Sequence, residues 1–183
     1  MQIISTTIPD LKIIQLKKYH DERGFFVERY NQKIFADLNL PINYFQDNHS
    51  FSLAGVVRGL HYQSNPPQLK LVGCLRGKIL DVAVDIRKNS PTFGKYFATE
   101  LSHENCRLLL IPAGFAHGFS VIDNDGADVF YKVDSPYNQA SEGGIIFDDP
   151  TLNIDWQVKS PIVSSKDKAL PTFAQYSKNP IFF

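Results

Sequence analysis

The sequence predicts an all-β fold, either a sandwich, a jelly roll or a barrel, on three observations. First, the apolar residues of segment 80–87 alternate with polar or small ones, the period of a half-buried strand. Second, only the short segments 31–38 and 164–169 are predicted as helices. Third, β-rich runs recur along the chain, at 11–16, 25–30, 44–51, 56–63, 69–74, 107–111, 117–122 and 128–133. Many short strands with few helices favour these architectures.

Turn-forming residues mark the ends of many of these runs in chain order. Glycine reaches positive φ, proline fixes φ, and Asn and Asp side chains bond to their own backbone, so each cluster predicts a chain reversal. The clusters lie at 21–24, 65–67, 76–77, 89–92 and 123–126. The segment after Trp156 is less regular but carries apolar residues such as Leu170 and Phe173. We therefore expect residues 1–183 to form a single domain.

The charge balance excludes several classes of partner. Lys and Arg together number 19, and Asp and Glu together also number 19, so the formal net charge is zero. No block of like charge occurs, so neither nucleic acid nor a membrane is expected as a partner. Residues 1–7 lack the features of a secretory signal, and the apolar run 108–119 is interrupted by Pro and Gly. A cytoplasmic protein is expected. Cys74 and Cys106 lie in strand-like apolar settings and are expected to be buried, reduced thiols.

Polar residues are unusually dense inside the predicted strands. The set is Gln46, Asp47, Asn48, Arg58, His61, Gln63, Lys70, His117 and Tyr131. A strand residue that faces a closed interior must find a partner or line a wet cavity, because an unpaired buried polar group costs about 1 to 3 kcal/mol. Sequence signatures of nucleophile elbows, dinucleotide-binding turns, phosphate loops and paired CxxC sites are absent. The pattern indicates a polar cavity within a β fold.

Several segments together resemble one known family. They are Arg23–Glu28 (RGFFVE), Phe45–Asn48 (FQDN), Val57–Gln63 (VRGLHYQ), Gln68–Leu71 (QLKL), Asp81–Arg87 (DVAVDIR), Ile111–Phe119 (IPAGFAHGF) and Ser165–Asp167 (SKD). In this order and almost end to end they resemble the dTDP-4-dehydrorhamnose 3,5-epimerase family. The resemblance implies a cupin-type double-stranded β-helix, or jelly roll, with short peripheral helices. It also implies a homodimer that exchanges N-terminal strands and acts in deoxysugar, commonly rhamnose, biosynthesis.

The resemblance also implies the catalytic roles. A lone strand histidine is more often structural, but here His61 matches the family's general base, and Asp167 matches the carboxylate that orients it. Tyr131 would otherwise read as a core aromatic; it matches the proton donor on the opposite face of the sugar ring. Lys70 would otherwise read as a solvated strand residue; it matches the cation that stabilises the enolate oxygen at C4.

Further positions match residues that hold the nucleotide-sugar. Single cations usually read as surface charges, but an arginine fork suits a diphosphate because it makes two charge-assisted hydrogen bonds. The implied ligand contacts are Arg23, Glu28, Gln46, Asp47, Asn48, Arg58, His117, Glu142 and Lys166, with Tyr137 stacking on the nucleobase. Arg23 and Glu28 are candidates for the partner subunit's site. His20, His49 and His103 match no such position and are read as structural or exposed.

Cupins that bind metals offer an alternative. Their ligand pattern aligns with Gly55, His61, Gln63 and Gln68, where glutamines replace the second histidine and the glutamate. A second pattern keeps Pro112, Gly114 and His117, which leaves two histidines where a transition metal needs about four ligands. We therefore expect no metal and no other cofactor.

The expected reaction converts dTDP-4-dehydro-6-deoxy-D-glucose into dTDP-4-dehydro-L-rhamnose by epimerisation at C3 and C5. Three alternatives remain open. They are an epimerase that inverts only C3 of a nucleotide-linked 4-keto-6-deoxy sugar, a metal-dependent cupin such as an oxygenase, and a non-catalytic sugar-binding cupin.

Overall fold

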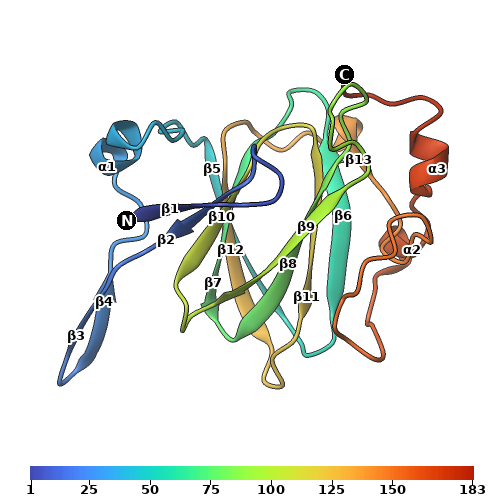
Figure 1. The fold of residues 1–183 in the computed structure, drawn as a ribbon. Coiled ribbons are helices and arrows are strands. Elements are labelled where there is room, and N and C mark those ends of the chain that lie inside the picture. The colour runs from blue at the N-terminus through green and yellow to red at the C-terminus, as the bar shows by residue number, and fades with distance from the viewer.

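Two antiparallel sheets pack face to face in the computed structural model, which describes residues 1–183 (Figure 1). The six-stranded sheet has the order β1 (Gln2–Ser5), β2 (Lys12–Gln15), β10 (Arg107–Ile111), β7 (Lys70–Arg76), β12 (Ala127–Val133) and β5 (Gln46–Ser52). The five-stranded sheet has the order β13 (Glu142–Gly144), β6 (Val57–Gln63), β11 (Phe115–Val121), β8 (Lys78–Asp85) and β9 (Tyr96–Ser102). Consecutive strands such as β7 and β8 lie in different sheets, so the chain crosses between them repeatedly. The predicted all-β cupin jelly roll is confirmed.

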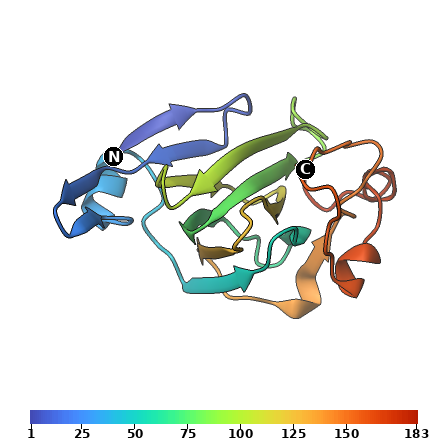
Figure 2. The ribbon, with the colours of Figure 1, turned by 90° about the horizontal axis from the view of Figure 1, so that it is seen from below.

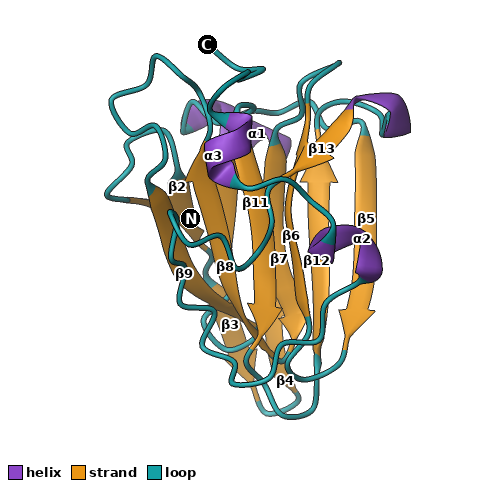
Figure 3. Ribbon diagram, turned by 90° about the vertical axis from the view of Figure 1, so that its right-hand side faces the viewer, coloured by secondary structure: helices purple, strands orange, loops and turns teal.

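Helices are short and lie at the margins of the sheets (Figure 3). They are α1 (Gln32–Asp37), α2 (Ser165–Lys168), α3 (Phe173–Tyr176) and the 3₁₀ turn Gln139–Ser141. The side chains of Asn31 and Ser164 cap α1 and α2 by accepting a hydrogen bond from the third helical N–H, as short polar N-cap residues do. Helices predicted at 31–38 and 164–169 are thus confirmed. The sequence analysis missed α3, which begins at a capping box of Thr172 and Gln175.

The chain ends lie on opposite sides of the two-sheet body (Figures 1 and 2). A separate hairpin of β3 (Lys18–Asp21) and β4 (Gly24–Val27), drawn in blue, projects from one side. The segment after β13, drawn in orange and red, covers the opposite side. β1, β3, β9 and β13 were not predicted as strands. β1 and β3 are short and largely exposed, so their residues carry no alternating pattern of burial.

The C-terminal segment changes how β8 is buried. Leu80, Val82 and Val84 on its outer face pack with Trp156 and Phe173 of that segment. The inner face contributes Ile79 and Ala83 to the core between the sheets. The prediction of a half-buried strand is therefore wrong, because every residue from Ile79 to Asp85 is buried.

The remaining sequence expectations concern the cysteines and the membrane. Cys74 and Cys106 are buried and free, as expected. Burial raises the pKa of the Cys74 thiol to about 12. None of the helices has the length and apolar character needed to cross a membrane.

Candidate active site

A cavity of about 770 Å³ opens between the two sheets. Most predicted site residues line it: Asp47, Asn48, Arg58, His61, Lys70, His117, Tyr131, Lys166 and Asp167. The sequence analysis did not assign the other lining residues, which are His49, Ser50, Val56, Val57, Gly118, Phe119, Ile162, Val163 and Ser164. Of these, 162–164 belong to the irregular C-terminal segment, where no periodic pattern indicates which side chains face inward.

The cavity forms where the inward-facing side chains of β7 and β12 change from apolar to polar along the strand. β12 contributes Val129 to the core and then Tyr131 to the cavity, as alternate residues of a strand share one face. β7 contributes Val72 to the core and then Lys70 to the cavity. Asn48 lies directly opposite Tyr131 in the sheet. One end of the jelly roll is therefore a dry core and the other a polar pocket.

His61 and Asp167 form the central pair of the pocket. His61 Nε2 lies 2.8 Å from Asp167 Oδ1, and the side chains are 28% and 6% exposed. A carboxylate only accepts hydrogen bonds, so Nε2 carries the proton and Nδ1 keeps the free lone pair. Burial raises the pKa of Asp167, but hydrogen bonds from His61, Gly59 and Ser164 and the charge of His61 outweigh it, and the pKa lies below its usual value.

Gly59 fixes the other oxygen of Asp167. Its backbone N–H donates to Asp167 Oδ2 at 3.2 Å. Its φ is +117°, and a Cβ atom there would lie 2.6 Å from the Cα of Gly118 on the neighbouring strand. Only glycine therefore allows β6 to approach β11 closely while it holds the carboxylate from α2.

Tyr131 belongs to the six-stranded sheet, whereas His61 belongs to the five-stranded sheet, so the two face one cavity from opposite walls. Burial raises the pKa of the Tyr131 phenol; the Arg58 charge lowers it and Glu142 raises it further. The phenol is accordingly protonated at neutral pH and can donate a proton.

Lys70 lies deep in the cavity, with Nζ 3.4 Å from the backbone oxygen of His61. Burial lowers the pKa of Lys70 to about 8, against the opposing influence of the Asp81 and Glu142 charges. The side chain is thus a cation near neutrality that loses its proton in mildly alkaline solution.

The predicted residues Gln46, Tyr137 and Glu142 do not line the cavity itself; they form its rim, since they are hydrogen-bonded to one another and to the lining residues Asn48 and Lys166. Glu142 accepts hydrogen bonds from Tyr137 Oη at 2.8 Å and from Lys166 Nζ at 2.7 Å. Gln46 donates to Asn48 Oδ1 at 2.7 Å and accepts from the Tyr137 backbone N–H at 3.2 Å. These contacts hold the exposed Tyr137 ring beside the mouth. The rim thus continues the polar surface of the pocket.

The cationic side chains have different partners. Arg58 donates from Nε to Ser52 Oγ at 2.9 Å and has no carboxylate partner, so its charge is available to an anion. Asp47 lines the margin, but its carboxylate pairs with Lys132 at 2.7 Å. Of the predicted contacts, Arg58 and Lys166 are the cations at the cavity, together with Lys70.

Arg23 and Glu28 are not brought to the cavity of their own chain. Arg23 lies in the turn of the β3–β4 hairpin and pairs with Asp21, and Glu28 accepts a hydrogen bond from Asn31. The expectation that they contact the ligand is not met within one chain, because the hairpin points away from the sheets. His103 is bonded to the Gly77 carbonyl, a structural role as expected, whereas His49 pairs with Asp128 and also lines the cavity, which was not expected.

Asp81 is the functional candidate that the sequence analysis missed. Its side chain is wholly buried, and Oδ2 accepts a hydrogen bond from His117 Nε2 at 2.9 Å. The alternation in 80–87 was the available signal, but the half-buried interpretation placed Asp81 on an exposed face.

The side-chain amides of the two glutamines at metal-ligand positions form hydrogen bonds with backbone groups. Gln63 donates to the carbonyls of Pro66 and Pro136 and accepts from the N–H of Asn138. Gln68 donates to the Ser135 carbonyl. No group of three or more His, Cys, Asp or Glu side chains is placed to hold a metal ion. These glutamines fix loops at the mouth; independence from metals stays a prediction.

Comparison with known proteins agrees with this geometry. The family model described as dTDP-4-dehydrorhamnose 3,5-epimerase matches residues 5–175. The Shigella flexneri enzyme of that name is 51% identical over 91% of this chain and 93% of its own. A Legionella pneumophila dTDP-6-deoxy-D-glucose-3,5-epimerase, solved with dTDP-4-keto-L-rhamnose, is 47% identical with a TM-score of 0.91, covering 94% of this chain and 93% of its own. A Streptomyces bikiniensis 3′-monoepimerase solved with dTDP-quinovose is 29% identical with a TM-score of 0.91, covering 97% and 91%. The chain therefore belongs to the dTDP-4-dehydrorhamnose 3,5-epimerase family.

Proposed function

We propose that this chain is an isomerase that inverts C3 and C5 of dTDP-4-dehydro-6-deoxy-D-glucose to give dTDP-4-dehydro-L-rhamnose, without metal or cofactor. One observation carries the proposal. A histidine oriented by a carboxylate lies on one wall of the cavity, and a protonated tyrosine lies on the opposite wall. Epimerisation needs this arrangement because the proton must leave from one face of the ring and return to the other.

The C4 ketone makes both centres acidic. His61 Nδ1 takes the proton from the carbon beside the ketone, the C–H electron pair moves into the new C–C double bond, and the carbonyl pair moves onto the oxygen. Asp167 stabilises the imidazolium that results, and the Lys70 ammonium stabilises the enolate oxygen. Tyr131 then donates its proton to the opposite face, which restores the ketone and inverts the centre. Solvent returns a proton to Tyr131 and accepts one from His61.

Charge and position support the assignment of the remaining contacts. Arg58 and Lys166 are cations at the cavity and would hold the diphosphate. Tyr137 is 55% exposed at the rim and would stack on the nucleobase. Asn48 and Gln46 form a linked pair of amides. With Asp47, His117 and Glu142 they would complete the contacts to the sugar nucleotide.

We further infer that two copies assemble as a homodimer through exchanged N-terminal strands. Large aromatic side chains of the β3–β4 hairpin, Tyr19, Phe25 and Phe26, are 54%, 46% and 67% exposed, an arrangement that favours a protein partner. Such an exchange would carry Arg23 and Glu28 to the partner's cavity. Two buried free thiols fit the expected cytoplasmic location. The packing of the C-terminal segment on β8 supports one domain over 1–183.

Inversion of C3 alone is the second candidate, favoured by the likeness to the 3′-monoepimerase. Identity to the 3,5-epimerases is higher, which favours the double reaction. Incubation of the purified protein with dTDP-4-dehydro-6-deoxy-D-glucose, followed by reduction of the ketone and proton NMR of the sugar, identifies the product. A sugar of the L-rhamno configuration is expected. Recovery of unchanged starting sugar would refute the proposed function.

A further inference from the structure

Strand β8 carries two wholly buried aspartates on one face. Asp81 and Asp85 both turn toward the space between the sheets and are four residues apart, which corresponds to about 13 Å along a strand. Buried carboxylates are rare unless they have partners, so each requires an explanation. Their surroundings differ, and this difference separates a structural carboxylate from a functional one.

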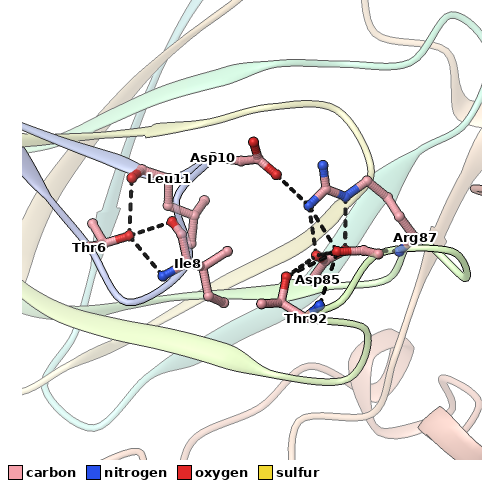
Figure 4. Close-up of polar contacts among 8 residues, drawn as sticks. Thr6, Ile8, Asp10, Leu11, Asp85, Arg87 and Thr92 are labelled. Atoms are coloured by element: carbon pink, nitrogen blue, oxygen red, sulfur yellow. Dashed lines mark hydrogen bonds and ion pairs between the residues drawn. The ribbon is translucent and has the colours of Figure 1, made fainter.

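Both carboxylate oxygens of Asp85 accept hydrogen bonds from neighbouring side chains (Figure 4). Its Oδ1 accepts from Arg87 Nε at 2.9 Å, and its Oδ2 accepts from Arg87 at 2.7 Å and Thr92 Oγ1 at 2.6 Å. Arg87 Nη2 also donates a hydrogen bond to Oδ2 of Asp10, in the loop between β1 and β2, at 2.8 Å. This network binds the N-terminal loop to the end of β8 and leaves no acceptor for a ligand.

Asp81 keeps one acceptor unused. Its Oδ2 accepts from His117 Nε2 at 2.9 Å, whereas its buried Oδ1 has no hydrogen-bond partner. Phe119, the residue directly opposite Asp81 on β11, lines the cavity, as does His117. The free oxygen is thus an uncompensated negative charge beside the pocket.

We propose that Asp81 is a positioning residue of the cavity, which holds His117 in one tautomer and supplies the counter-charge for the Lys70 ammonium. Because the carboxylate accepts a hydrogen bond from the Nε2–H group, the proton of His117 stays on Nε2, and His117 presents Nδ1, an acceptor, to the ligand. Because the carboxylate is negative and buried, it opposes the loss of charge that burial imposes on Lys70.

Other ionisable groups also face Lys70 and His117. Besides Asp81 on β8, which adjoins the lining through His117, the cavity is lined by Asp47 and His49 on β5, Arg58 and His61 on β6, Tyr131 on β12, and Lys166 and Asp167 on α2, with Glu142 on β13 at the rim. Of these, Asp81 and Glu142 are the charges that raise the pKa of Lys70, and the Asp81 influence is the larger. Glu142 already shares hydrogen bonds with Tyr137 and Lys166. Lys70 Nζ lies 3.4 Å from the carbonyl oxygen of His61, which is directly opposite His117, and the Asp81 carboxylate bonded to His117 keeps an unpaired oxygen, so Asp81 is placed to act as the counter-charge.

The inference rests on the proposed function and is tested by kcat and KM as a function of pH for wild type, Asp81→Asn and Asp85→Asn. Asp81→Asn is expected to lower kcat by about tenfold or more and to move the alkaline limb of its pH profile to lower pH by about one unit. Asp85→Asn is expected to lower the melting temperature and leave the limb in place. If Asp85→Asn does not fold, Thr92→Val serves as the control instead, because it removes only one hydrogen bond to Asp85.

Two results would overturn the inference and leave the proposed function intact. One is an active wild type whose alkaline limb and kcat are unchanged by Asp81→Asn. The other needs no folded variant of Asp81: ¹⁵N NMR of the wild-type imidazoles, with His117 assigned by its loss in His117→Gln, should show the proton on Nε2. A proton on Nδ1 would contradict the tautomer. An inactive wild type would instead refute the proposed function.

Discussion

His61 on β6 and His117 on β11 lie directly opposite each other in the five-stranded sheet, and each shares a hydrogen bond with its own buried aspartate. Asp167 reaches His61 from the C-terminal helix α2, whereas Asp81 reaches His117 from the adjacent strand β8. Residues opposite each other in an antiparallel pair point to the same side of the sheet. The two imidazoles therefore face one cavity, each in a tautomer set by its own carboxylate.

Replacement of His61 by Asn removes the proposed base and keeps a polar side chain of smaller size. Turnover should fall by roughly two to four orders of magnitude, the usual contribution of a positioned general base, while binding of dTDP stays near normal. Steady-state kinetics and calorimetric titration with dTDP measure the two effects. His103→Asn, which alters a histidine bonded to the Gly77 carbonyl, is the matched control. Near-normal turnover in His61→Asn would remove His61 from its role.

Replacement of Asp167 by Asn should reduce turnover less than His61→Asn, because the imidazole remains in place and loses only its orienting charge. The same replacement should also change how the stability of the fold depends on pH in acidic solution. The folded-state pKa of Asp167 lies below its ordinary value of 3.8, so its ionised form stabilises the fold above that pH, and this contribution is lost as the pH falls through the lower folded value. Thermal unfolding at acidic and neutral pH should show a smaller acid-induced loss in Asp167→Asn than in wild type. Equal losses would contradict the linkage.

Activity should decline in mildly alkaline solution. The pKa of Lys70 is about 8, so the ammonium that stabilises the enolate is lost as the pH rises through that value. The profile of kcat against pH should therefore have an alkaline limb near pH 8. Lys70→Gln should retain only a small residual rate with no limb at that pH. If the alkaline limb persists in Lys70→Gln, the limb arises from the ionisation of another group.

Removal of metals should leave turnover unchanged. Gln63 and Gln68 use their amides to hold loop carbonyls, and amides are poor substitutes for imidazole and carboxylate ligands. Prolonged chelation followed by activity assay and elemental analysis tests this. Activity lost on chelation and restored by one specific metal would favour the metal-dependent cupin instead.

Most strands and the helices α1 and α2 could be predicted because they depend on local patterns, and most of the residues that line the cavity lie in the segments that resemble the family. Alternation identified β8, a β-rich run identified β12, and the residues around His61 and His117 carry distinctive motifs. The burial of Asp81 could not be predicted, because the alternation does not reveal that Trp156 and Phe173 cover the apolar face of β8, so that the face carrying Asp81 is the one between the sheets. The place of Arg23 relative to the cavity could not be predicted either, since no local pattern shows that the β3–β4 hairpin projects from the two sheets and that Arg23 pairs with Asp21.

The opposed arrangement of His61 and Tyr131 is tested most directly by proton NMR of the keto-sugar nucleotide incubated with the enzyme in deuterated water. The wild type should incorporate deuterium at both C3 and C5. Tyr131→Phe should retain some exchange, because His61 can remove and return a proton on one face, but it should yield little or no doubly inverted product. Wild-type label at C3 alone after long incubation would contradict double epimerisation, and full inversion by Tyr131→Phe would contradict the division of labour between the two walls.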